Sequence, residues 1–184
     1  ESEVETRLQD LINEQSGTTV APLASPGEVR IRLTAKAESE PAALARIAPV
    51  EDAIRSRLGQ YLYGIDEDTL AEIVIRLLTE KGLTLALAES CTGGLLASQL
   101  TDVPGASACL SAAIVSYSEQ SKVRELGIPR EVLARYGPVS EEVCSAMARG
   151  IRELTAADLG IGITGVAGPG GGSAETPVGQ VFIG

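Results

Sequence analysis

The stretch Ala88–Gly94, Ala-Glu-Ser-Cys-Thr-Gly-Gly, places a hydroxyl beside a thiol at Ser90 and Cys91. Apolar residues alternate with small or polar ones over residues 83–87, which predicts a strand, and apolar residues with helical spacing follow over residues 95–100. A strand-to-helix turn directs backbone N–H groups and the positive end of a helix dipole at one point. These residues favour a nucleophile with an oxyanion hole or an anion-binding turn, and a plain Ser/Thr helix cap with a tight glycine turn explains them equally well.

The chain contains no histidine. A Ser-His-Asp triad or a Cys-His dyad is therefore excluded, and a nucleophilic Ser90 would need a lysine, a tyrosine or a carboxylate as its base. Only the helix dipole is available to lower the pKa of Cys91, so we interpret this thiol as a small packed side chain. Together with Cys109 and Cys144 it forms no CxxC pair, which predicts no metal site and reduced thiols in a cytoplasmic protein.

A second candidate group follows the apolar run 109–117, which is typical of a buried strand. Tyr117 ends this run, and Lys122 lies in the next helical turn. Ligands of α/β sheets usually bind at the carboxyl ends of strands. Ser90, Tyr117 and Lys122 would converge there if the two strands are neighbours. The alternative is that Tyr117 is an edge aromatic residue and Lys122 a solvated helix residue.

The third candidate is the glycine-rich loop at residues 164–173, Thr-Gly-Val-Ala-Gly-Pro-Gly-Gly-Gly-Ser. It lacks the Gly-Lys-Ser/Thr of a Walker A motif, and no helix with dinucleotide-binding spacing follows it. Its backbone N–H groups suit a phosphate. The alternative is a flexible, hairpin-like connection.

Composition narrows the class of protein. The chain of 184 residues is 44% hydrophobic but only 3% aromatic, so its core is built mainly from Val, Ile, Leu and Ala. A net charge of −10 disfavours non-specific binding of nucleic acid. No apolar run reaches membrane-spanning length, and no signal peptide opens the chain. Because it begins at Glu1 without Met and stops within an apolar run at Gly184, we expect a fragment of a longer protein.

Residues 1–65 are expected to form a small α+β domain. The patterns predict a helix over residues 4–12, a hairpin with strands at 20–23 and 29–37, and a helix over 41–62 in which Pro49 is the candidate break. Gly64 and the acidic run 66–68 mark the domain boundary. This run also starts the next helix, which we expect Asp66 or Asp68 to cap and Gly82 to end.

Residues 66–184 alternate between helical and strand patterns. After the Ser90 turn and its helix we predict a strand at 109–117, helices at 118–126, at 130–136 and from residue 140, and strands at 159–163 and 178–183. Such alternation predicts a layered α/β/α domain with a mostly parallel or mixed sheet.

These motifs occur in an order that resembles the C-terminal, nicotinamide mononucleotide deamidase domain of the CinA family over residues 66–184. They are Ala88–Gly94, Val115–Ser118 with Lys122, Tyr136–Ser140, Thr164–Ser173 and Pro177–Gly179. Residues 1–65 are similar, more weakly, to the KH-type linker domain of longer CinA proteins.

The resemblance implies an amidohydrolase that converts nicotinamide mononucleotide and water into nicotinate mononucleotide and ammonia without a metal or other cofactor. It makes Ser90 the nucleophile and Tyr117 and Lys122 its activating partners. We expect oxyanion donors near Thr92 and Gly93, and we expect the glycine loop to hold the nucleotide. The full set of expected substrate-binding residues is Glu89, Thr92, Gly93, Gly94, Thr164, Gly165, Gly168, Gly170 and Gly171.

The chain also departs from the longer family members. They begin with a molybdopterin-binding-like domain linked to nucleotide pyrophosphatase activity, and their deamidase domain continues beyond the position of Gly184 with an arginine implicated in the site. Residues 1–65 contain no GxxG and have a net charge of −3, from 7 basic and 10 acidic residues. We therefore expect no RNA binding by the usual KH route.

The expected partners are nicotinamide mononucleotide and a second copy of the chain, with the KH-like domain as the candidate dimer contact. No nucleic acid and no membrane is expected. A second hypothesis is a non-catalytic fragment that binds a nucleotide and dimerises. Release of ammonia from nicotinamide mononucleotide distinguishes the two.

Overall fold

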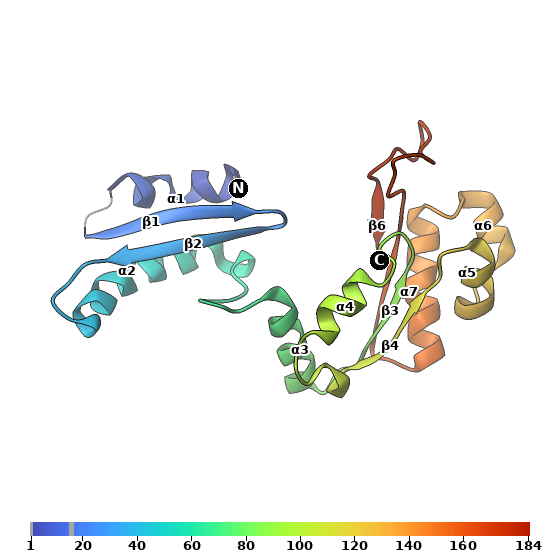
Figure 1. The fold of residues 1–184 in the computed structure, drawn as a ribbon, viewed down its shortest axis with the longest axis horizontal. Coiled ribbons are helices and arrows are strands. Elements are labelled where there is room, and N and C mark those ends of the chain that lie inside the picture. Colours follow the sequence, from blue (N-terminus) through green and yellow to red (C-terminus); the bar gives the residue numbers. More distant parts are fainter. Residues whose placement is uncertain (1, 15–16) are drawn as a thin grey trace. The chain divides into compact units, whose positions relative to one another are not determined.

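The computed structural model describes residues 2–14 and 17–184 (Figure 1). The chain forms two compact units, residues 1–63 and 64–184, and each is described by itself.

The N-terminal unit packs two helices against a β-hairpin. Its elements are α1 (Ser2–Glu14), β1 (Thr18–Ser25), β2 (Glu28–Ala35), α2 (Glu40–Leu58) and a 3-10 turn, η1 (Gly59–Tyr61). β1 and β2 are antiparallel, and their register places Ser25 opposite Glu28 across the predicted turn. Buried apolar side chains from both helices and β1 form one small core, namely Leu8, Val20, Ile54 and Leu58. This arrangement confirms the small α+β domain.

Helix α2 runs through Pro49 without a break. Proline costs the helix the hydrogen bond to the carbonyl of Ala45, but its fixed φ is compatible with helical geometry. The residues after it carry Ile54 and Leu58 into the core, which holds the second half of the helix in place. Ser39 caps the start of the helix by accepting a hydrogen bond from the N–H of Ala42.

The C-terminal unit contains a four-stranded sheet, five α-helices and a 3-10 turn among the described residues. In chain order its elements are α3 (Leu70–Lys81), β3 (Leu85–Glu89), α4 (Leu95–Thr101), η2 (Ala106–Ala108), β4 (Leu110–Val115), α5 (Glu119–Leu126), α6 (Arg130–Tyr136), α7 (Glu141–Thr155), β5 (Leu159–Gly165) and β6 (Val181–Ile183). The strand order is β4-β3-β5-β6. β3 is parallel to β4 and β5, whereas β6 is antiparallel to β5, so the sheet is mixed.

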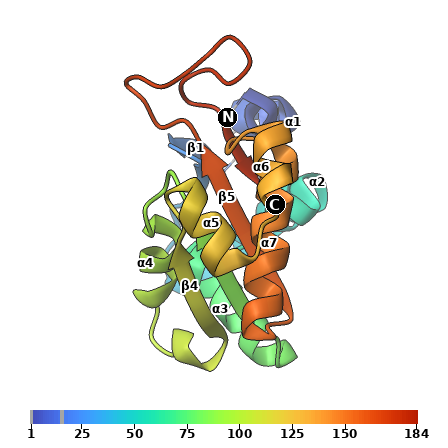
Figure 2. The ribbon, with the colours of Figure 1, turned by 90° about the vertical axis from the view of Figure 1, so that its right-hand side faces the viewer.

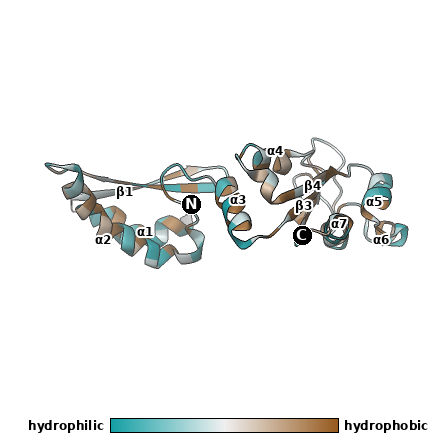
Figure 3. Cartoon of the chain, turned by 90° about the horizontal axis from the view of Figure 1, so that it is seen from below, coloured by the Kyte–Doolittle hydropathy of each residue, from teal (hydrophilic) through white to brown (hydrophobic). Residues whose placement is uncertain are grey.

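The helices cover both faces of this sheet (Figure 1). Side chains of β3 alternate between the faces. Leu85 and Leu87 pack with α3 and α4, whereas Ala86 and Ala88 pack with α5, α6 and α7. The hydropathy colouring shows β3 and β4 as hydrophobic, which fits their place between the two helical layers (Figure 3). The predicted α/β/α layering is therefore confirmed.

Helix α7 lies directly against β5 (Figure 2). A Cβ added to Gly160 would lie 2.2 Å from the carbonyl oxygen of Ala148, and one added to Gly162 would lie 2.4 Å from that of Cys144. Both distances are far below van der Waals contact, so only glycine permits the helix to approach this closely. α7 is thus seated on the middle of the sheet.

The predicted cap of helix α3 was wrong. Thr69, rather than Asp66 or Asp68, begins the helix: its side chain accepts the N–H of Glu72, and the Glu72 carboxylate accepts the N–H of Thr69 at 2.8 Å. This reciprocal pair is a capping box, which requires Glu three residues after the cap. Asp68 instead accepts the N–H of Ile65. Gly82 ends the helix with φ of +63°, as predicted.

Two strands are shorter than predicted. β4 ends at Val115, so Tyr117 lies beyond the strand. β6 begins at Val181, because the residues before it form a turn in which the N–H of Gln180 donates to Pro177 O at 3.1 Å. Within the described residues, no helix is both long and apolar enough to cross a membrane.

Candidate active site

Three parallel strands end at the same edge of the sheet, where β3 reaches Glu89, β4 reaches Val115 and β5 reaches Gly165. The register pairs Glu89 with Val115 on one side and with Ile163 on the other. The N–H of Ser116 extends the ladder by donating to Glu89 O at 2.8 Å. The turns that follow these strands therefore lie next to one another.

Ser90 and Lys122 contact each other at this edge. The Nζ of Lys122 lies 3.0 Å from the Oγ of Ser90 and donates to the carbonyl oxygen of Ser116 at 2.7 Å. Lys122 is 1% exposed and Ser90 is 7% exposed. The alternative that Lys122 is a solvated helix residue is thereby excluded.

The environment of Lys122 favours its neutral form. Burial lowers the pKa of the amine below its ordinary value, while the charges of Glu119 and Cys91 act in the opposite direction. A lysine with a lowered pKa can accept a proton near neutral pH, which an exposed lysine does poorly. The pair therefore has the arrangement of a hydroxyl nucleophile and its base.

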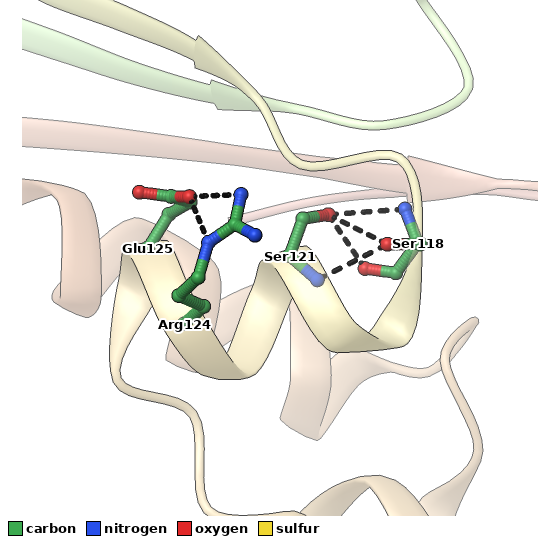
Figure 4. Close-up of polar contacts among 4 residues, drawn as sticks. All are labelled: Ser118, Ser121, Arg124 and Glu125. Carbon is green, nitrogen blue, oxygen red and sulfur yellow. Dashed lines mark hydrogen bonds and ion pairs between the residues drawn. The ribbon is translucent and has the colours of Figure 1, made fainter.

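Helix α5 holds Lys122 in place. Ser118 caps the helix, and the side chains of Ser118 and Ser121 each accept the other's backbone N–H at 3.1 Å (Figure 4). The N–H of Lys122 donates to Ser118 O in the first helical turn. Gly127 ends the helix with φ of +64°. The start and the end of the short helix are thus both fixed, and its single lysine faces the sheet edge.

Glu89, one of the expected substrate-binding residues, holds the entrance of helix α4. Its side chain is 1% exposed, and its carboxylate accepts the N–H groups of Gly94, Leu96 and Ala97 at 3.2, 3.2 and 2.8 Å. These are the first donors of α4, whose cap residue, Gly94, has no side chain to satisfy them. Glu89 therefore orients the helix entrance, and both of its carboxylate oxygens already accept backbone N–H groups.

The same bonds identify the amides that remain available in the turn. The N–H of Gly93 donates to Ser90 O at 3.0 Å, and that of Gly94 is taken by Glu89. Among the amides of residues 91–94, those of Cys91 and Thr92 make no hydrogen bond in the described structure. Of the two predicted oxyanion donors, the Thr92 amide is therefore free and the Gly93 amide is occupied. The free amide of Cys91 is a further candidate donor that was not predicted.

Tyr117 does not join the Ser90–Lys122 contact. Its side chain is 73% exposed, and its hydroxyl makes no hydrogen bond within the described residues. The apolar pattern predicted a strand up to residue 117, whereas β4 ends two residues earlier. The side chain therefore lies beyond the sheet edge.

The glycine loop connects two antiparallel strands, as a hairpin does (Figure 2). Its first residues are packed: Thr164 is fully buried and its hydroxyl donates to Pro138 O at 2.8 Å. A Cβ on Gly165 would lie 2.6 Å from Gln180 O. The hydroxyl of Thr164 is thus bound within the fold, and Gly165 allows the close approach of Gln180.

The middle of the loop is open. Gly168 has φ of +82°, and a Cβ there would lie 2.5 Å from Val178 Cγ1. By contrast, a Cβ on Gly170 or Gly171 would meet nothing within 4 Å. Gly170 and Gly171 therefore leave their backbone accessible, and Gly168 sets the path of the loop toward them.

Sequence reasoning missed Ser116. Its carbonyl oxygen is one of the two hydrogen-bond partners of the Lys122 amine, and its own hydroxyl is buried without a partner in the described structure. Ser116 does lie inside the Val-Ser-Tyr-Ser motif, which was a usable signal. The hydroxyl oxygen of Thr92 is likewise buried without a partner.

A cleft lies outside this site, and no metal-binding group is found among the described residues. A cleft of about 630 Å³ beside α6 and α7 is lined by Ile128, Val132, Glu142 and Arg149 among others, and none of the predicted site residues lines it. The described residues contain no group of three or more His, Cys, Asp or Glu side chains placed to hold a metal ion.

The fold and the site define a three-layer α/β/α protein that holds a serine–lysine pair at the carboxyl edge of a mixed sheet. Residues 67–184 match the CinA C-terminal domain, and residues 1–64 match the KH domain of the damage-inducible protein CinA. The chain belongs to the CinA family.

Relatives and solved structures agree with this assignment. A putative competence-damage inducible protein of Moorella thermoacetica is 53% identical over the whole chain, and a CinA-like protein of Kosmotoga olearia is 46% identical over 97% of it. The chain spans only 44% and 43% of those two proteins.

Among solved structures, the competence/damage inducible protein CihA of Agrobacterium tumefaciens is 42% identical, with a TM-score of 0.62 over 66% of this chain and 74% of that one. A CinA superfamily protein of Escherichia coli is 33% identical, with a TM-score of 0.58 over 69% of this chain and 83% of that one.

Proposed function

We propose that the chain carries an amidohydrolase site that converts nicotinamide mononucleotide and water into nicotinate mononucleotide and ammonia, with Ser90 as nucleophile and Lys122 as its base. One observation supports this most directly: a buried lysine amine lies 3.0 Å from the serine hydroxyl. The substrate is the one that the resemblance to the deamidase domain implies. The chain has no histidine, so a lysine base is chemistry that it can supply.

The first half of the reaction forms an ester between enzyme and substrate. Neutral Lys122 takes the proton of Ser90 as Oγ bonds to the carboxamide carbon, and the carbonyl oxygen becomes an oxyanion. The free amides of Cys91 and Thr92 are the proposed donors to this oxyanion. The Lys122 ammonium then gives its proton to the leaving nitrogen as the C–N bond breaks, which releases ammonia.

The second half removes the ester with water. Lys122, neutral again, takes a proton from the attacking water, whose oxygen bonds to the same carbon. Collapse of the second tetrahedral intermediate breaks the bond to Oγ, and the ammonium returns its proton to Ser90. The product is the nicotinate carboxyl group, and both residues are restored.

The nucleotide end of the substrate needs a separate contact. The open glycines Gly170 and Gly171 have unhindered backbone, and N–H groups of this kind bind phosphate without a basic side chain. We propose that this part of the loop takes the phosphate. Nicotinamide riboside, which lacks it, should then be a much poorer substrate.

The test is ammonia release from nicotinamide mononucleotide by the protein expressed from its complete gene. Ser90→Ala should abolish release, because the attacking oxygen is removed. Cys91→Ala is the matched control one residue away, and it should keep most of the activity. An active Ser90→Ala together with an inactive, folded Cys91→Ala would reverse the assignment. Binding of the nucleotide without any ammonia release by the wild type would favour the non-catalytic alternative.

A further inference from the structure

Ser116 carries a hydroxyl that the fold does not use. The residue directly follows β4 and is fully buried. Its N–H donates to Glu89 O and its carbonyl accepts from Lys122, yet its Oγ has no hydrogen-bond partner in the described structure. Leaving a buried hydroxyl unpaired destabilises a fold by about 1–3 kcal/mol, so such a group calls for an explanation.

The change in the number of hydrogen-bond donors on Lys122 during the reaction explains the unpaired hydroxyl. A neutral amine has two N–H donors, whereas an ammonium has three. In the described structure the amine nitrogen has two partners, Ser90 Oγ and Ser116 O. When Lys122 takes the proton of Ser90, a buried ammonium forms with one donor more than the site now satisfies. A buried charge of this kind is costly unless every donor is paired.

The charged groups near Lys122 do not provide an acceptor for the third N–H of the ammonium. The groups that act on its titration are Glu119, which precedes it on α5, and Cys91, on the turn after β3. Neither makes a hydrogen bond to Nζ in the described structure. The carboxylate of Glu89, at the end of β3, is already taken by the amides of α4.

We propose that the Ser116 hydroxyl is the third acceptor of the Lys122 ammonium that forms after proton transfer. It would stabilise the charge and so hold Lys122 basic enough to act as the base. Ser116 Oγ belongs to the residue whose carbonyl already binds Nζ, and rotation about its Cα–Cβ bond changes the direction in which the hydroxyl points. Ser116 is then a positioning residue, and this role rests on the proposed function of Lys122.

The test compares Ser116→Ala with Ser98→Ala, which removes an exposed hydroxyl from α4. The pKa of Lys122 is measured by NMR titration of side-chain carbon signals; the chain has three lysines, Lys36, Lys81 and Lys122, which makes assignment direct. Ser116→Ala should lower the pKa of Lys122 by about one unit, the size expected for a hydrogen bond to a charged group. The acidic limb of kcat/KM should move to lower pH by the same amount. Ser98→Ala should change neither.

Stability separates this role from a structural one. Removal of an unpaired buried hydroxyl should leave Tm unchanged or raise it. The proposal is overturned if Ser116→Ala titrates like Ser98→Ala, whether or not Tm falls. The titration needs no substrate. A shifted Lys122 pKa without ammonia release from the wild type would overturn the amidase assignment and retain the coupling of Ser116 to Lys122.

Discussion

The two units of the chain differ in where they place their polar groups. In the N-terminal unit ion pairs join surface side chains, with Arg57 bound to Asp10, Arg7 to Glu3 and Arg55 to Glu51. Of the buried polar side chains within residues 2–14 and 17–184, Thr18 lies in this unit, and the rest lie in the C-terminal unit. Those are Glu89, Ser90, Ser116, Lys122 and Thr164.

Each of the five lies in the last two residues of a strand of the central sheet, directly follows such a strand, or contacts a residue that does. Burying a carboxylate and an amine is costly, and apolar residues would fill the same space more favourably. The N-terminal unit shows that the chain can build a core without such groups. A buried lysine whose pKa is lowered is typical of a functional site, so the contrast singles out this sheet edge. The four variants below test that contrast, in order of expected effect.

Of these four variants, Lys122→Met should produce the largest loss of activity. The apolar side chain keeps the volume but removes the proton acceptor, so kcat should fall by a factor of roughly 10²–10⁴ with a smaller change in KM. Steady-state ammonia release measures both. Lys81→Met, which changes an exposed lysine near the end of α3, is the control and should behave as the wild type. If Lys122→Met and Lys81→Met lowered kcat equally, the buried Lys122 would have no special role in the reaction.

Lys122→Met should also change how the free energy of unfolding depends on pH. Burial lowers the pKa of Lys122 in the folded state below its ordinary 10.5. Between these two values the unfolded chain binds more protons than the folded one, so wild-type stability should rise with pH in that window. Lys122→Met should lose this rise, which denaturant unfolding at several pH values would show.

The glycine loop should give the next largest effect. Gly168→Ala introduces a Cβ at φ of +82° and within 2.5 Å of Val178 Cγ1, whereas Gly170→Ala meets nothing within 4 Å. Gly168→Ala should lower kcat/KM for the nucleotide by about tenfold, the effect of one to two kcal/mol of strain. Gly170→Ala should have a small effect. Nicotinamide riboside should respond less to Gly168→Ala; an equal loss on both substrates would place the phosphate elsewhere.

Tyr117→Phe should have a still smaller effect. The resemblance implies an activating role, but the side chain is 73% exposed and its hydroxyl makes no hydrogen bond in the described structure. We therefore expect kcat/KM to stay within about twofold of the wild type, since a neutral surface hydroxyl contributes little. A loss as large as that of Lys122→Met would mean that the hydroxyl enters the site when substrate binds.

Much of the C-terminal unit follows from local pattern. The alternation over residues 83–87 predicts a strand, which the structure confirms as β3 with both faces buried, and Gly82 and Ser140 mark helix ends that the structure also confirms. The rule that parallel strands end at one edge predicts that Ser90 and Lys122 meet there only if their strands are neighbours. The sequence left that condition open, and the structure meets it by pairing β3 with β4.

The roles that sequence reasoning did not anticipate depend on which backbone groups the fold leaves unpaired. Glu89 binds the amides of α4 because Gly94, the cap residue, has no side chain to do so. Ser116 contacts Lys122 through its carbonyl, which every residue type possesses. The type of residue therefore carried no signal for that contact, and the only usable signal was the position of Ser116 inside the Val-Ser-Tyr-Ser motif. The prediction for Tyr117 depended on where β4 ends, and the ends of strands are the part of an element that a sequence pattern predicts least well.

Asp10→Asn should have the smallest effect, and it tests the N-terminal side of the contrast. The hydrogen bond from Arg57 lowers the pKa of Asp10 from 3.8 to about 2. A group with a lowered folded pKa stabilises the fold above its unfolded pKa and loses that contribution as pH falls through the folded one. The wild type should therefore be slightly more stable than Asp10→Asn above pH 3.8, with the gap closing toward pH 2. Thermal unfolding followed by NMR of α1 and α2 amides measures it, with the exposed Asp52→Asn as control. Because the pair is solvent-exposed, the difference should also shrink at high salt. A gap that survives at pH 2 or in high salt would mean that the N-terminal unit, like the sheet edge, depends on charge shielded from water.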